Sequence, residues 1–96
     1  MRELLIKKRA ENALNKVARY LAAQYFPSTG EKFIHEFIDH CLVYSSVNVK
    51  YPLCRSEMLA KRGFSCFVFK RKWIVAFKYS DDNFQVCRFI YGPRLK

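Results

Sequence analysis

The residues best suited to chemistry lie near the end of the chain, where Tyr91 stands between Arg88 and Arg94. A phenol titrates near pH ~10 in water, and neighbouring cations favour its ionised form, so Tyr91 is the best candidate for a general base or acid. Arg94 could clamp a phosphate through two parallel hydrogen bonds, and Arg88 could lie beneath a cleft as a supporting charge. Each residue also has an interpretation without a chemical role. Tyr91 would be an ordinary strand aromatic, Arg94 a solvated charge in the tail, and Arg88 a strand arginine paired with an acidic residue.

Two further groups of cations lie close by in the sequence. One precedes the first strand of a predicted meander and the other occupies the next turn, and both could contact phosphates. The alternative for the turn is that its charges only solvate an exposed hairpin. Glu57 and His40 are the remaining candidate proton carriers, but neither has a defined partner. The candidate target-binding residues are Lys61, Arg62, Lys70, Arg71, Lys72 and Lys78.

The charge of the chain is concentrated in its second half. Residues 50–96 hold eleven Lys and Arg against three acidic residues, a net charge of +8, whereas residues 1–49 hold seven against five, a net charge of +2. This balance favours a polyanionic partner, either a nucleic acid or an acidic protein. With 96 residues, 51% of them hydrophobic, the chain can fill one core, so we expect a single domain over residues 1–96.

Several classes of protein are excluded by the composition. No apolar run approaches the roughly 20 residues of a membrane span, and the charged start, residues 1–9, does not fit a signal peptide, so we expect a cytoplasmic protein. His35 and His40 are poorly spaced for joint ligation from one helical face, and we predict no metal and no cofactor. Four cysteines without paired spacing predict buried thiols rather than disulfides or a zinc site. They are Cys41, Cys54, Cys66 and Cys87.

A helical pattern follows a short predicted strand at residues 3–7. Apolar residues recur at helical spacing from Ala10 to Tyr25, and residues 27–30 then break the pattern. Ser28, with Glu31 three residues later, is typical of a capping box and predicts the start of a second helix, whose apolar stripe covers residues 34–42. The two helices should form a hairpin.

The second half of the chain has the alternation of strands. After a connector at residues 46–61, with a possible edge strand near Met58, strands are predicted at residues 64–70, 73–79 and 84–91. Short turns make them an antiparallel meander, with the helices on one side and the other side left for a ligand. Along the last strand, Arg88 alternates in register with the apolar residues at 84, 86 and 90. The predicted fold class is α+β: a strand, a two-helix hairpin and a three-stranded meander.

This arrangement resembles the RelE/ParE superfamily of bacterial toxins from type II toxin–antitoxin systems over nearly the whole chain. The best local match is the ending, residues 86–94, where Val-Cys-Arg-Phe-Ile-Tyr-Gly-Pro-Arg is similar to the family's apolar last strand followed by His-Gly-x-Arg, with Tyr91 in the His position. Residues 73–79 and the acidic turn at Asp81 and Asp82 resemble the family's middle strand and hairpin.

The resemblance implies a cytosolic bacterial growth inhibitor, of the kind found in plasmid stabilisation systems, encoded beside an antitoxin that wraps and neutralises it. The antitoxin should be acidic where it touches the basic sheet. The resemblance also implies that Arg94 and the pair Lys61 and Arg62 line the functional cleft. Two mechanisms share this fold: RelE-like members cut mRNA in the ribosomal A site without metal, whereas ParE-like members poison DNA gyrase.

Two departures from the family bear on the choice. Metal-free RNA cleavage needs a base, an acid and cations that stabilise the phosphorane. Where many RelE-like toxins have an arginine after the aromatic of the middle strand, this chain has the apolar Ile74, and Lys78 or Lys70 would replace the planar fork of arginine with a point charge. A terminal extension with a catalytic tyrosine is also missing after Arg94. We therefore lean slightly toward ParE-like gyrase inhibition, with a RelE-like mRNA endonuclease as the alternative.

A third class of function is a non-toxic module that binds RNA or DNA. In that case Phe67, Phe69 or Phe89 would serve as stacking platforms between basic residues. The competing interpretation is that these rings pack against the helices as core, because alternating phenylalanines in a sheet are usually buried.

Overall fold

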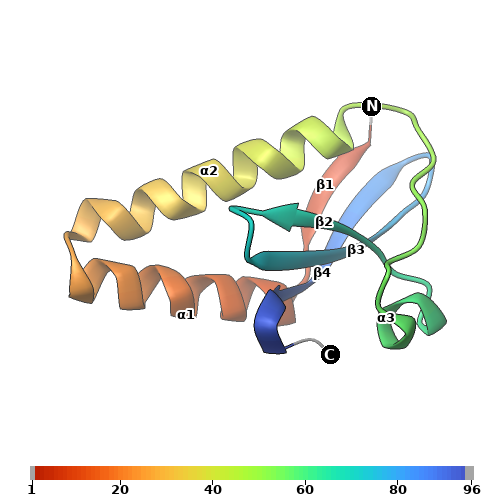
Figure 1. The fold of residues 1–96 in the computed structure, drawn as a ribbon. Helices are drawn as coiled ribbons and strands as arrows, with labels where there is room; N and C mark the ends of the chain where they lie inside the picture. The colour runs from red at the N-terminus through yellow and green to blue at the C-terminus, as the bar shows by residue number, and fades with distance from the viewer. Residues whose placement is uncertain (1, 95–96) are drawn as a thin grey trace.

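The computed structural model describes residues 2–94, with Arg94 as backbone only, and has two long helices against one face of a four-stranded sheet (Figure 1). The strand order is β1-β4-β3-β2; β1 runs parallel to β4, and the other neighbours are antiparallel. The predicted α+β fold class is confirmed. In chain order the elements are β1 (Glu3–Ile6), α1 (Lys8–Gln24), α2 (Pro27–Ser45), α3 (Glu57–Lys61), β2 (Ser65–Phe69), β3 (Trp73–Tyr79), β4 (Asn83–Tyr91) and a final 3₁₀ turn (Gly92–Arg94).

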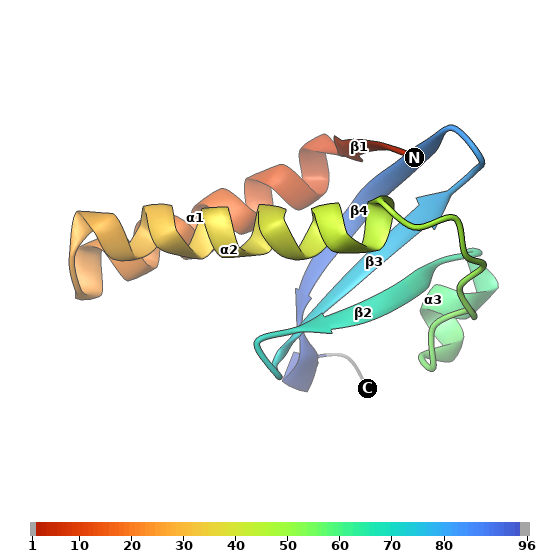
Figure 2. The same ribbon diagram turned by 90° about the horizontal axis from the view of Figure 1, so that it is seen from above.

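The helices α1 and α2 form the expected hairpin, which extends beyond the sheet (Figure 2). The start predicted for α2 was wrong: the helix begins at Pro27, which suits a first helical position, and Ser28 makes no capping hydrogen bond. Gly30 therefore lies inside the helix, buried against α1. A side chain there would collide with the backbone carbonyl of Ala18, so the absence of a Cβ lets the two helices approach.

The main core lies between the helices and the sheet and consists largely of aromatic rings. Phe37 is fully buried, and its ring meets those of Phe69 and Phe89 edge to face at centroid distances of 5.5 and 5.3 Å. Phe67, Phe69 and Phe89 are 5%, 1% and 6% exposed. The idea that these three rings serve as stacking platforms is therefore wrong, because the helices already cover them.

The sequence suggested that the opposite face of the sheet is open for a ligand. In the structure this face is partly covered. Alternate residues of β3, Ile74 and Ala76, join Leu59 and Phe64 in a second, smaller cluster, which α3 covers. The possible edge strand near Met58 was also wrong, because that residue lies in α3.

A left-handed glycine ends α3 and turns the chain toward β2. Gly63 has a φ of 81°, its amide donates to Ala60 O, and the amide of Phe64 donates to Leu59 O. These two bonds form a Schellman motif, in which apolar residues on either side of the turn pack together. Here those residues are Leu59 and Phe64, so the turn and the second cluster support each other.

The cysteines depart from the prediction. Cys54 in the connector and Cys66 in β2 form a disulfide, with Cα atoms 5.0 Å apart, whereas Cys41 and Cys87 are buried free thiols. Sequence spacing did not reveal the pair because the contact is made by the fold: the chain leaves the sheet at Cys54, forms α3 and returns. Burial raises the pKa of the Cys41 thiol to about 12.

A buried arginine near the start of the chain ties three segments together. Arg2 is 5% exposed; its side chain donates to Ser80 O at 2.7 Å and to Val47 O at 2.9 Å, and its guanidinium lies 4.7 Å from the centre of the Tyr79 ring. The carbonyls and the ring compensate for the loss of water around this charge. Among residues 2–94, no helix is long and apolar enough to cross a membrane.

Candidate functional site

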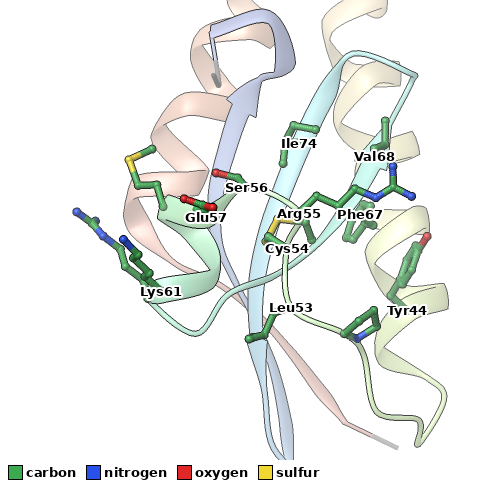
Figure 3. A pocket seen from close by; sticks show the side chains of 14 residues that line it. Tyr44, Leu53, Cys54, Arg55, Ser56, Glu57, Lys61, Phe67, Val68 and Ile74 are labelled. Atoms are coloured by element: carbon green, nitrogen blue, oxygen red, sulfur yellow. A yellow bond between two sulfur atoms is a disulfide. The ribbon is translucent and has the colours of Figure 1, made fainter.

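A groove runs along the outer side of β2. We call it the edge groove; it has a volume of about 1220 Å³ and is bordered by the end of α2, the connector, α3 and β2 (Figure 3). Three of its apolar side chains, Leu53, Met58 and Val68, are more than half exposed. The cations on this groove are Arg55, Lys61 and Arg62, with Glu57 as the acidic residue. In the view of Figure 3, Arg55 extends across the groove toward Val68.

A second, smaller groove, of about 360 Å³, lies between the start of α1, α3 and the end of β4. We call it the arginine groove because Arg9, Arg62 and Arg88 all line it, together with Tyr91. Within residues 2–94 no carboxylate lies within ion-pair distance of these three arginines. Guanidinium groups without a carboxylate partner suit a phosphate or carboxylate group, although that of Arg88 already donates to Cys87 O at 2.9 Å.

A β-bulge brings Arg88 to this groove. The register between β3 and β4 shifts at Ala76 and Phe77, so Arg88 pairs with Ala76 and leaves the face that holds Phe84 and Val86. The simple alternation predicted from the sequence was wrong at this point, because a bulge inserts one extra residue into a strand.

The ring of Phe64 contacts two of the predicted cations. The guanidinium of Arg88 lies 5.3 Å and the ammonium of Lys78 lies 5.1 Å from the centre of its ring. Lys78 lines neither groove. Lys78 therefore lies against the small cluster, on the ring of Phe64, and not in the arginine groove.

Tyr91, at the end of β4, also lines the arginine groove. It is 39% exposed, and its ring packs 5.3 Å from Trp73. The next residue, Gly92, donates its amide to Lys72 O at 2.6 Å, which ties the end of β4 to the β2–β3 turn. The side chain of Arg94, the other predicted catalytic residue, lies outside the described residues.

The β2–β3 turn carries the cations Lys70, Arg71 and Lys72, but none of them lines a groove. Lys70 and Arg71 have φ of 51° and 67°, which is unfavourable for residues other than glycine or asparagine. The ammonium of Lys70 lies 2.6 Å from a carboxylate oxygen of Glu36 in α2. This hydrogen bond holds the pKa of Glu36 below its usual value. Lys70 is therefore engaged with the helical hairpin.

The two other candidate proton carriers, Glu57 and His40, lie apart from each other and do not line the arginine groove. Glu57 lines the edge groove, whereas His40 lies on α2 with its ring 5.3 Å from that of Phe69. Among residues 2–94, no group of three or more His, Cys, Asp and Glu side chains could hold a metal ion. Cations line both grooves, and each groove has a tyrosine: Tyr44 in the edge groove and Tyr91 in the arginine groove.

Two cations of the grooves, Arg9 and Arg55, were missed by sequence reasoning. Arg9 reaches the arginine groove because α1 begins beside β4, and this placement follows from the parallel pairing of β1 and β4 rather than from a motif. Arg55 belongs to the same 13-residue loop, residues 54–66, as Lys61 and Arg62. Three cations within 13 residues were the feature of the sequence that could have indicated Arg55 as a groove residue.

The order of the elements and the strand order β1-β4-β3-β2 define a small α+β fold. No family model matches the sequence, and no curated protein matches it significantly. Among solved structures, a chain of the "Chromosomal ParDE TA system from P. aeruginosa" matches with a TM-score of 0.65 over 95% of this chain and 96% of that one, at 11% identity. The likeness confirms the fold that the sequence resemblance implied.

Proposed function

We propose that this chain is a growth-inhibiting toxin of a type II toxin–antitoxin system, acting on DNA gyrase in the manner of ParE. The observation that carries the proposal is the match to a chain of the ParDE system over nearly the whole length of both chains. The position of Ile74 gives independent support for a non-nucleolytic action. It packs in the small cluster and lines the edge groove, so an apolar group stands where RelE-like toxins need a cation.

The test is inducible expression in a bacterial host, with DNA breaks and mRNA 5′ ends followed in the same cultures within minutes. Gyrase inhibition predicts double-strand breaks with intact mRNA, and purified gyrase should trap cleaved supercoiled DNA when the protein is added. Continued growth with neither lesion would refute the toxin assignment.

One observation favours a ribosome-dependent mRNA endonuclease as the second candidate. Tyr91, Arg88 and Arg62 line one groove, and metal-free cleavage needs a proton carrier and cations that stabilise a phosphorane. Codon-phased mRNA cuts would identify this mechanism. Tyr91→Phe should then abolish cleavage while the fold is kept, whereas Tyr20→Phe, an exposed residue of α1, should have no effect.

The proposed partner is a cognate antitoxin with an acidic, partly apolar segment. The edge groove combines exposed Leu53, Met58 and Val68 with three cations, which suits a peptide that has apolar anchors between carboxylates. Association with such a partner should slow as salt is raised. A partner segment that is neutral or basic where it meets the groove would contradict this assignment.

A further inference from the structure

The disulfide closes a loop that contributes to both grooves. Residues 54–66 leave the sheet at Cys54, form α3 and return at Cys66. Met58 and Arg62, both in this loop, line the edge groove and the arginine groove. The position of Arg62 relative to Arg9 and Arg88 therefore depends on how firmly the loop is held.

Without the disulfide, the loop has few other attachments. Leu59 is the buried residue of α3, a helix too short to be stable alone. At the base of the loop, the amide of Cys54 donates to Phe64 O at 2.9 Å, and Leu53 pairs with Ser65 in an isolated bridge. Together with buried Phe64, these contacts keep the loop on the sheet, but they leave α3 the freedom to shift.

We propose that Cys54 and Cys66 form a reversible dithiol–disulfide switch, which sets the order of loop 54–66 and so the strength with which the two grooves bind an anionic ligand. The inference rests on the proposed function, because a toxin that acts on gyrase or the ribosome works in a reducing compartment. Disulfides in such compartments are usually transient and often redox-sensing.

Of the two bonded cysteines, Cys66 is the more exposed to a thiol reductant. Cys66 is partly exposed at the wall of the edge groove, whereas Cys54 is 8% exposed. The thiolate of a glutathione-type thiol attacks Cys66 Sγ; the Cys54–Cys66 bond breaks, and Cys54 Sγ leaves as a thiolate and takes up a proton. A second thiol attacks the mixed disulfide and releases Cys66 as a thiol. Two external thiols are thus oxidised to one disulfide while the protein gains two electrons and two protons.

The other two cysteines are poor competitors in this exchange. Cys41 is fully buried in the main core. Cys87 is 7% exposed, and its thiol donates to Gln85 O at 3.4 Å. Reactivity toward external thiols is therefore confined to the pair in the loop, since attack requires access to sulfur.

The test compares oxidised and reduced protein in three measurements. Purified protein is equilibrated in glutathione buffers that span the cytosolic and oxidising ranges, and thiols are trapped by alkylation and located by mass spectrometry. Amide hydrogen exchange then follows residues 54–66, and elution from a heparin column reports on anion binding. We expect full reduction of the pair in the cytosolic range, exchange in the loop that is about tenfold faster, and elution at lower salt.

Two variants separate the switch from general loss of structure. Cys54→Ser combined with Cys66→Ser should behave as reduced protein in every buffer, and Cys87→Ser should keep the full redox response. The proposal is overturned if the pair stays oxidised in cytosolic buffers, if it never forms a disulfide in oxidising ones, or if reduction leaves both loop exchange and heparin elution unchanged. None of these results depends on growth inhibition, so a failed toxin assignment is recognised separately.

Discussion

The two faces of the sheet are built in different ways. On the helix face, α1 and α2 cover a large core of packed aromatic rings. On the other face, the five-residue α3 covers a small cluster, a disulfide ties the covering loop to β2, and cations surround it. Buried apolar area provides stability, whereas unpaired surface cations attract partners. We infer that the helix face carries the stability and the α3 face carries recognition.

The largest contrast should come from one phenylalanine on each face. Phe37→Ala removes a fully buried ring that packs against two others, and we expect a loss of about 4 kcal/mol in the free energy of unfolding. Phe64→Ala should cost less, about 2 kcal/mol, because the short α3 loop can collapse into the space. Urea denaturation measures both values. Equal losses would contradict the division between the faces.

The next largest effect tests how closely the helices pack. Gly→Ala in a helix normally stabilises, but Gly30→Ala places a methyl group against the backbone carbonyl of Ala18. We expect a loss of about 2 kcal/mol, because backbone atoms must move apart. The control is Ser28→Ala, which removes a hydroxyl that caps nothing and should leave the free energy of unfolding nearly unchanged. Stabilisation by Gly30→Ala would show that the helices do not touch there.

The two faces also differ in how well the sequence predicts them. The helices and strands were predictable because apolar residues recur with periods near 3.6 and 2, and β3 was located at residues 73–79 with its observed bounds. The α3 face was not predictable in this way, because a helix of five residues is too short to show a periodic pattern. The bulge that moves Arg88 off the face of Phe84 and Val86 is a local defect in the alternation, and the contact of Cys54 with Cys66 depends on the path of the loop.

The candidate site was predicted in part for the same reason. Arg88 was proposed from its register in the last strand, and Arg62 and Tyr91 from the resemblance to the RelE/ParE superfamily. The structure places all three on one groove, and their roles stay predictions. Arg9 was not found, because the parallel pairing of β1 with β4 connects residues 80 positions apart in the sequence. The turn cations, in contrast, lie outside both grooves.

A smaller effect, of opposite sign, is expected at the β2–β3 turn. Arg71 has a φ of 67°, which costs a residue with a Cβ about 1 kcal/mol relative to glycine. Arg71→Gly should therefore raise the free energy of unfolding by roughly that amount. Lys72→Gly removes the same charge from a residue without a positive φ and should not stabilise. If both variants stabilise equally, charge repulsion rather than backbone strain explains the gain.

The smallest effect on stability should accompany a clear effect on recognition. Arg62 is exposed and makes no ion pair within residues 2–94, so Arg62→Gln should change the free energy of unfolding by less than about 0.5 kcal/mol. It should nevertheless lower the salt concentration at which the protein leaves a heparin column, because Arg62 lines both grooves. Arg19→Gln, on the exposed side of α1, removes an equal charge outside both grooves. If the two variants elute together, binding follows net charge alone; earlier elution of Arg62→Gln would assign anion recognition to the α3 face.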